Sequence, residues 1–384
     1  MRVSTLCILA ACLLANELTA ATLSIGYLEY KAPRPPVLSN VIAPAEDEGL
    51  QGALLGIADN NTTGRFLKQT FELSEFVTDD KLVALAQAKI WLASGMPYLV
   101  VRGDTQLTLQ ITQLARPSGT LVFNAGSKSD ALRQQDCQVN LFHTMPSYAM
   151  LTDALGQWLL ARKLRRWLLV HGDKWADKQY SQAIERSAQR YGATIVDKKQ
   201  WHFKTDLRRQ AQAEVPLFTQ TEEYDVVVVA DELGDFGEFI PYNTWYPRPV
   251  VGTQGLVPKA WHKVIEQWGA AQLQKRFEDQ AQRWMQEADY AAWLAVRTIG
   301  EAAARLNSLN PSDINEYLGS ASFSLGGFKG RRLSYRPWSG QLRQPIPLLQ
   351  PMALVSQSPQ AGYLHPITDL DTLGFDESEV HCIR

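Results

Sequence analysis

The sequence predicts an α/β protein with two doubly wound parallel-sheet lobes, joined by a hinge and separated by an interlobe cleft. Short runs of β-branched and aromatic residues alternate with amphipathic stretches of helical period from residue 21 to residue 230, which is the order of βαβ units. The apolar run at 225–230 is typical of a strand buried on both faces of a parallel sheet. Because 384 residues exceed what one sheet of ordinary width uses, we expect two lobes.

The expected elements follow one another in this alternating order. Strands are predicted at residues 22–28, 70–77, 98–101, 120–124, 167–170, 193–197 and 224–230. Helices are predicted between them at residues 49–68, 81–94, 105–114, 146–164, 176–191 and 206–219. After residue 252 the pattern indicates helices at 258–269, 273–284, 289–306 and 311–318, and then a β-hairpin of 331–335 with 344–349.

Residues 1–20 have the pattern of a cleaved export signal. Arg2 precedes an apolar run that is too short to span a bilayer, and small residues suited to a signal peptidase follow at Thr19 and Ala20. The alternative is lipid attachment at Cys12, which ends a run of suitable composition but is followed by apolar residues instead of a polar tether. We therefore expect export in soluble form.

Composition and cysteine content limit the classes of partner. A net charge of −2 argues against nucleic acid, because phosphate binding needs a concentrated basic surface. Once the signal is removed, two cysteines remain, Cys137 and Cys382. In an oxidising compartment we expect them to form a disulfide, with two separate thiols as the alternative.

No catalytic or metal-binding motif is recognised in the sequence. It lacks a phosphate-binding loop, a zinc-protease motif and a nucleophile elbow, and its six histidines have no ligand spacing. We expect no cofactor, no resident metal and no enzyme activity, so a binding protein is the better interpretation. An exported hydrolase would need a nucleophile with a base, and no such combination can be recognised in the sequence.

Three segments resemble the type I periplasmic binding proteins. Residues 49–66 resemble the first helix of that family, although Thr62 and Thr63 precede a single Gly64 where the branched-chain amino-acid binders have Asn-x-x-Gly-Gly. Residues 140–147 resemble the crossover into the second lobe, with His143 in place of the usual arginine, and residues 329–340 resemble a late hairpin of the family.

The resemblance implies a division of the chain and a role. Lobe 1 would comprise residues 21–143 and 248–330, lobe 2 residues 144–247 and 331–350, and residues 351–384 a C-terminal tail. The implied role is that of a monomeric, periplasmic solute-binding component of an ABC transporter, which closes on a small molecule or ion and then docks on a membrane permease.

A narrower resemblance concerns residues 58–66, residues 336–345 and the cysteine near the C-terminus. These are similar to the ABC-transporter binding proteins associated with pyrroloquinoline-quinone-dependent alcohol oxidation. This implies a role beside periplasmic alcohol dehydrogenases, without naming a ligand. A periplasmic sensor or assembly factor of the same fold, without transport, is the alternative.

Loops at the carboxyl ends of the predicted strands are expected to line the cleft. In the first lobe these loops hold Arg102 and the group Asn124, Ala125, Gly126 and Ser127. Small residues and a hydroxyl would supply N–H and O–H donors to an anionic or oxygen-rich group, unless the loop is an ordinary βα turn.

In the second lobe, acidic and aromatic residues are the candidates. Asp231 and Glu232 follow the strongest predicted strand and could face a cation or an amine. Trp245 and Tyr148 could stack on an apolar or planar ligand, although the aromatics near 247–249 could equally pack a loop.

Overall fold

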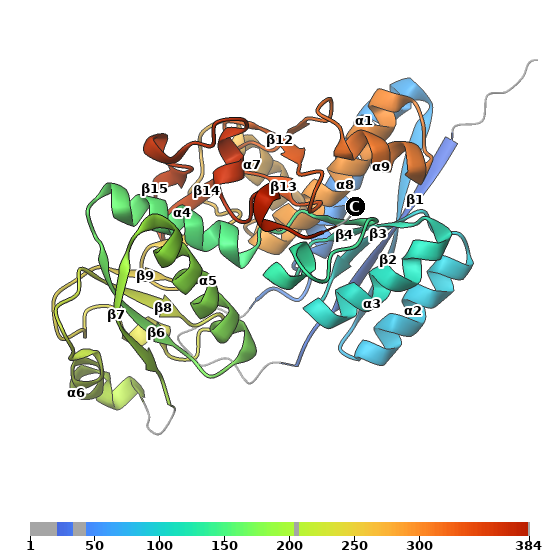
Figure 1. The fold of residues 1–384 in the computed structure, drawn as a ribbon. Coiled ribbons are helices and arrows are strands. Elements are labelled where there is room, and N and C mark those ends of the chain that lie inside the picture. Colours follow the sequence, from blue (N-terminus) through green and yellow to red (C-terminus); the bar gives the residue numbers. More distant parts are fainter. Residues whose placement is uncertain (1–20, 34–43, 203–206, 383–384) are drawn as a thin grey trace, which may run out of the picture.

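The structure, a computed structural model, describes residues 21–33, 44–202 and 207–382 (Figure 1). It contains two parallel β-sheets, each flanked by helices, which confirms the predicted α/β fold class. The expected signal peptide at 1–20, with the alternative lipid site at Cys12, and the expected start of a helix at Asp206 lie outside the described residues.

The first sheet has five parallel strands in the order β2-β1-β3-β4-β5. Its strands are β1 (Ala21–Tyr30), β2 (Gln69–Thr78), β3 (Tyr98–Arg102), β4 (Leu121–Asn124) and β5 (Leu141–His143). Its helices are α1 (Leu50–Leu67), α2 (Lys81–Ala93), α3 (Thr105–Ala115), α7 (Ala270–Ala281), α8 (Glu287–Leu306) and α9 (Pro311–Gly319).

Alternation along β3 divides the core of this lobe between its two faces. Tyr98 and Val100 pack in the cluster formed with α1, α7, α8 and α9, whereas Leu99 and Val101 pack against α2 and α3. Successive side chains of a strand point to opposite faces, so a run that is apolar at every position is buried on both. This explains why these strands could be predicted from composition.

The second sheet has four parallel strands in the order β7-β6-β8-β9. Its strands are β6 (Arg166–His171), β7 (Thr194–Gln200), β8 (Val226–Ala230) and β9 (Val250–Gly252). Helices α4 (Tyr148–Ala161) and α5 (Trp175–Tyr191) cover one face, and α6 (Leu207–Thr219) lies on the other.

Two small antiparallel sheets complete the fold. One contains β10 (Val257–Pro258), β14 (Ile346–Gln350) and β15 (Ala353–Ser358), and the other contains β11 (Leu325–Gly326), β12 (Arg332–Tyr335) and β13 (Leu342–Arg343). Most of these strands have only two to five residues, too few to give a periodic signal in the sequence.

The structure corrects two predicted elements. Residues 259–269 form irregular turns instead of a helix, although Ala260, Trp261 and Ile265 are buried at a spacing that imitates one. The predicted hairpin partner is also wrong, because β12 pairs with the nearby Leu342–Arg343 and β14 pairs with β15. A tight turn at Gly340, where φ is +65°, returns the chain directly onto β12.

The strand pairing also differs from the expected division into lobes. β9 extends the second sheet, although residues 248–330 are expected in lobe 1. Within 331–350, which is expected in lobe 2, Leu333 and Tyr335 pack in the core of the first lobe, whereas Ile346 and Leu348 pack in that of the second. Residues 353–358 pair with β14 as β15, so the expected tail is partly built into a sheet.

The crossover between the lobes is held by buried polar side chains. Arg133, which is 2% exposed, donates hydrogen bonds to the carbonyls of Ser127, Ser129 and Met145 at 2.8–3.0 Å. Gln341 donates to the carbonyls of His143 and Met145 at 3.2 and 3.3 Å. These bonds tie the loop after β4 to the chain as it enters the second lobe.

The C-terminal strap, residues 368–382, contacts both lobes. Asp371 accepts a hydrogen bond from Arg336 at 2.8 Å, and the Gly374 N–H donates to Asp153 of α4 at 2.8 Å. The strap ends at the expected disulfide, which joins Cys382 to Cys137 of the first lobe across 245 residues. Among the described residues, no helix is both long and apolar enough to cross a membrane.

Candidate functional site

The loops at the carboxyl ends of β4 and β8 meet directly, although they belong to different sheets. Lys128, in the loop after β4, donates a hydrogen bond from Nζ to Oε2 of Glu232 at 3.3 Å. Glu232 lies in the loop after β8. The geometry therefore brings a predicted site residue of the second lobe against the first lobe at the strand ends where open α/β sheets bind ligands.

The loop after β4 is organised by the side chain of Asn124. Its Oδ1 accepts hydrogen bonds from the N–H groups of Gly126 at 3.1 Å and Ser127 at 2.8 Å, and its Nδ2 donates to the Ser127 carbonyl at 2.8 Å. The Ala125 N–H donates to the Val101 carbonyl at 2.9 Å. The N–H donors that the sequence suggested for an anionic ligand are thus already used inside the loop.

Gly126 and Ser127 instead fit this loop against its neighbour. A Cβ at Gly126 would lie 2.9 Å from the backbone nitrogen of Gly103, so the close approach of the loops after β3 and β4 requires glycine. The Ser127 hydroxyl lies 3.0 Å from that of Thr105 at the start of α3.

Arg102, at the end of β3, neutralises internal carboxylates. It forms ion pairs with Glu29, whose side chain is fully buried, and with Glu48 at 3.2 Å. Burial alone lowers the pKa of Arg102, but Glu29 and Glu48 outweigh it and raise that pKa. Its guanidinium therefore joins β3 to β1 and to the segment that leads into α1.

The two predicted acids of the second lobe have different roles. Asp231 is 2% exposed and accepts hydrogen bonds from the N–H groups of Asp235, Phe236 and Gly237 at 2.6–2.9 Å. It therefore shapes its own loop, as aspartates at strand ends often do. Glu232 instead directs its carboxylate to the place where the loops after β4 and β8 meet, and accepts a hydrogen bond there from Lys128.

Tyr148 contacts the same carboxylate. It is the first residue of α4, after the N-cap Ser147, and its hydroxyl donates to Glu232 Oε2 at 3.3 Å. The ring of Tyr180 packs edge-on against that of Tyr148 with centroids 5.8 Å apart. Within the described ranges, the buried Tyr180 hydroxyl has no hydrogen-bond partner.

A second carboxylate approaches Lys128 from the first lobe. Glu287 begins α8, and its Oε2 lies 3.9 Å from Lys128 Nζ while its Oε1 accepts the Ala260 N–H at 2.6 Å. We call Lys128, Tyr148, Tyr180, Glu232 and Glu287 the junction cluster. Sequence reasoning missed Lys128, Tyr180 and Glu287, although Lys128 directly follows the predicted loop and could have been included.

The charges of the junction cluster depend on one another. Burial alone lowers the pKa of Lys128, but Glu232 and Glu287 outweigh it and raise that pKa, so the side chain is an ammonium. Burial alone raises the pKa of Glu287, but Lys128 and Lys259 outweigh it and lower that pKa. Burial, then Glu232 and Glu287, raise the pKa of the Tyr180 phenol, which stays neutral and able to donate.

Trp245 is not brought to the junction. Its N–H donates to Oγ1 of Thr219, the last residue of α6, at 2.8 Å, and Arg248 pairs nearby with Glu223 at 2.9 Å. Glu223 precedes β8, so this region lies at the amino end of the sheet. The loop must return to that end because β9 runs parallel to β8.

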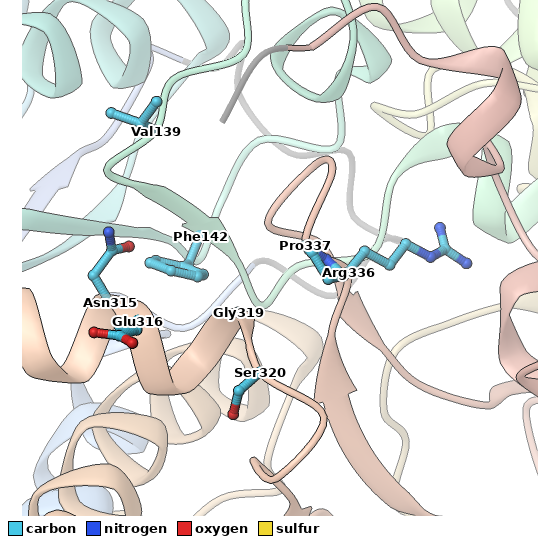
Figure 2. A pocket seen from close by; sticks show the side chains of 8 residues that line it. All are labelled: Val139, Phe142, Asn315, Glu316, Gly319, Ser320, Arg336 and Pro337. Atoms are coloured by element: carbon cyan, nitrogen blue, oxygen red, sulfur yellow. The ribbon is translucent and has the colours of Figure 1, made fainter.

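A pocket of about 260 Å³ lies elsewhere, beside the edge strand β5 (Figure 2). The residues that line it come from β5 and the segment before it, from α9 and the residue after it, and from the turn after β12: Val139, Phe142, Asn315, Glu316, Gly319, Ser320, Arg336 and Pro337. None of the predicted ligand-binding residues is among them. Arg336 points away from the other side chains in Figure 2 and is bonded to Asp371. In the described chain, no group of three or more His, Cys, Asp or Glu side chains is placed to hold a metal ion.

Several solved structures share this fold. A branched chain amino acid ABC transporter periplasmic ligand-binding protein from Burkholderia xenovorans LB400 is 18% identical, with a TM-score of 0.70 over 87% of this chain and 95% of that chain. A leucine-, isoleucine-, valine-, threonine- and alanine-binding protein from Brucella ovis, in a closed conformation, is 17% identical, with a TM-score of 0.67 over 86% of this chain and 89% of that chain.

An amino acid ABC transporter substrate-binding protein from Pseudomonas fluorescens Pf-5 is 12% identical, with a TM-score of 0.70 over 95% of this chain and 100% of that chain. No curated protein sequence matches the chain. The family model for periplasmic binding proteins matches residues 38–241, which is more than half of the 384 residues. Given this match and the two parallel sheets joined at their strand ends, the chain belongs to the periplasmic binding protein family.

Proposed function

We propose that the chain is the periplasmic solute-binding component of an ABC transporter and closes its two lobes on a small ligand at the junction cluster. The observation that carries this proposal is the Lys128–Glu232 hydrogen bond of 3.3 Å between loops of different sheets. A ligand that contacts both loops favours the arrangement in which they are close, and so shifts the population toward closure. The closed form would then dock on a membrane permease as a monomer.

Support for transport comes from the family and from its structural neighbours. Two of the neighbours described above are named as ABC-transporter binding proteins for amino acids, and the third is named as a binding protein for five amino acids. At 12–18% identity these likenesses show the fold alone, so the ligand must be inferred from this chain's own residues. We infer a periplasmic location from the family as well, and the pattern of an export signal at 1–20 agrees with it.

We also propose a link to pyrroloquinoline-quinone-dependent alcohol oxidation, on the sequence resemblance at 58–66 and 336–345. In the structure these segments have architectural contacts. Asp59 accepts a hydrogen bond from Trp293 Nε1 at 2.9 Å, and Arg336 holds the C-terminal strap. Because these contacts stabilise the fold, the two segments point to a subfamily and do not select a ligand. A sensor or assembly factor without transport remains the second candidate.

Ligand-dependent stabilisation of the purified protein tests the binding function. The panel contains short alcohols, aldehydes, their acids, amino acids, pyrroloquinoline quinone, and calcium and lanthanide salts. A ligand at 100 times its dissociation constant adds about 2.7 kcal/mol to the free energy of unfolding. That corresponds to a rise of several degrees in the midpoint of thermal unfolding.

A saturable shift with one chemical class would support solute binding and name the ligand. Loss of growth on short alcohols, but not on succinate, in a strain lacking the gene would support the link to alcohol oxidation. If no compound shifts the midpoint while the deletion still impairs growth on alcohols, the sensor or assembly role replaces transport.

A further inference from the structure

The junction cluster already contains a bound ammonium group, and that group belongs to the protein. Lys128 Nζ lies 3.3 Å from Glu232 and 3.9 Å from Glu287. The three groups come from the loop after β4, the loop after β8 and the start of α8, so no single element brings them together. Two carboxylates with a tyrosine hydroxyl at one of them form a site suited to a primary ammonium.

A ligand that carries its own ammonium group would have to displace Lys128. The displaced lysine would lose both carboxylates in a place where its side chain is only 21% exposed. Burying an ammonium without a partner is strongly unfavourable. Amino acids and amines are therefore disfavoured in the chain as it stands.

Anionic ligands are disfavoured because the cations near the site are already paired. Within the junction cluster one ammonium faces two carboxylates, and the charge of Lys259 already acts on Glu287, whose pKa it helps to lower. Arg102 does not compensate, because it is already shared between Glu29 and Glu48. A carboxylate ligand would be repelled unless it could recruit a further cation.

Groups suited to an uncharged polar ligand remain. Tyr180 is 2% exposed, and its buried hydroxyl has no hydrogen-bond partner among the described residues. An unused buried donor of this kind is costly unless something fills it. The Tyr148 ring packs against the Tyr180 ring with centroids 5.8 Å apart, and the Tyr148 hydroxyl contacts Glu232 at 3.3 Å, so Tyr180 lies next to the residues of the junction. A hydroxyl or carbonyl oxygen could accept from Tyr180, and a hydroxyl could donate to a carboxylate.

We propose that Lys128 is a built-in ammonium group which occupies the cation position of the site, so that the chain binds uncharged hydroxyl or carbonyl compounds and rejects amino acids and amines. This inference rests on the proposed solute-binding function and specifies its ligand class. The resulting site would differ in specificity from the amino-acid-binding proteins whose fold it shares.

The test uses probes that differ only in their head group. For each carbon skeleton from two to five carbons, the primary alcohol, aldehyde, carboxylate and amine are compared, together with L-leucine. Dissociation constants come from thermal-shift titration and calorimetry. The wild-type protein is expected to bind alcohols or aldehydes at least tenfold more tightly than the matching amines.

The substitution Lys128→Met removes the ammonium group and keeps most of the apolar stem. It leaves Glu232 and Glu287 without their cation, so amines and L-leucine are expected to gain at least tenfold in affinity and to restore lost thermal stability. Lys178→Met, at an exposed position of α5, is the matched control and should leave every dissociation constant at its wild-type value. Because unpaired acids could impair folding, the double variant Lys128→Met with Glu232→Gln serves as a second test; it is expected to fold without gaining amine affinity.

Two results would overturn the inference, and they can be told apart. If wild type binds amines or L-leucine as tightly as Lys128→Met does, solute binding stands and the built-in ammonium is rejected. If neither protein binds any head group, the proposed solute-binding function fails, and the inference fails with it.

Discussion

At the scale of single residues, short polar side chains at the strand ends form hydrogen bonds with the backbone of their own loops. Asn124 ends β4 and Asp231 directly follows β8, so both lie at the carboxyl ends of buried strands. Their side chains nevertheless accept hydrogen bonds from nearby backbone N–H groups, two for Asn124 and three for Asp231. Sequence position predicts the loop, but the partner of a short polar side chain depends on backbone conformation. Glu232 has a longer side chain and reaches across to the other lobe.

Asp177 makes a pH-dependent contribution to stability. It lies in the first turn of α5 and accepts the Glu232 N–H at 2.8 Å, which joins α5 to the loop after β8. Burial, with a further contribution from Asp231, raises its pKa from 3.8 to about 6. Between these two values the folded protein holds a proton that the unfolded chain has released. The free energy of unfolding therefore falls as pH rises through this window, by at most roughly 3 kcal/mol.

The substitution Asp177→Asn removes this titration and keeps an oxygen that can accept the Glu232 N–H. Urea unfolding at several values from pH 4 to pH 7 should show wild type losing stability relative to the variant as pH rises. Asp173→Asn, at an exposed position just before α5, is the control and should run parallel to wild type. Parallel profiles for Asp177→Asn would show that its carboxyl titrates normally.

At the scale of elements, α1 and α8 pack so closely that small residues are required between them. An ideal Cβ at Gly52 would lie 1.9 Å from the carbonyl oxygen of Asp289, and one at Gly56 would lie 2.8 Å from Val296. Asn60 also donates a hydrogen bond from Nδ2 to the Val296 carbonyl at 2.8 Å. The sequence predicted both helices from their periodicity, but it gave no sign that they form a pair, since they are far apart in the chain.

Gly52→Ala is expected to destabilise the protein, although alanine favours a helix by about 1 kcal/mol over glycine. The new methyl group meets a backbone carbonyl that cannot rotate away, so the helices must separate; overpacking of this kind costs about 1–3 kcal/mol. Gly319→Ala is the control, because a Cβ at that end of α9 meets no atom within 4 Å. Urea midpoints measure both, and a Gly52→Ala midpoint at or above wild type would contradict the close packing.

The two elements predicted wrongly have a common cause. Residues 259–269 have helical spacing of apolar groups, but tertiary contacts decide their conformation: the Ala260 N–H donates to Glu287 and the Lys259 N–H donates to the Pro347 carbonyl. The strand at 346–350 likewise finds its partners in β10 and β15. Local sequence patterns cannot predict these conformations and strand partners, because both depend on segments that are distant in the chain.

At the scale of the whole molecule, the two-sheet architecture could be predicted because its strands are apolar on both faces and separated by amphipathic helices. The division between the lobes could not, since the chain passes from one to the other in short segments. Gln344, for example, donates to the Thr144 carbonyl at 2.9 Å across 200 residues of sequence. The C-terminal strap adds a covalent connection that only the cysteine count suggested.

Removing the disulfide should weaken the whole molecule. Loss of a native bridge typically costs about 2–5 kcal/mol, and the long closed loop favours the upper part of that range. The hydrogen bonds of Asp371 and Gly374 remain, so the strap should stay docked near α4 while its end loosens. We expect Cys137→Ser with Cys382→Ser to unfold at lower urea concentration than wild type, and reductant to move wild type to the same midpoint. Equal midpoints with and without reductant would contradict this stabilising role.

The position of the two cysteines also sets an order of events while the chain is being made. Cys382 is added 245 residues after Cys137. At a synthesis rate of 5–20 residues per second, this interval is roughly 12–50 s. Throughout it Cys137 has no native partner and is open to pairing with a foreign thiol. Oxidation of this pair therefore requires that the chain has been made as far as residue 382, and a product truncated before that residue would carry a free thiol at Cys137 that labelling could detect.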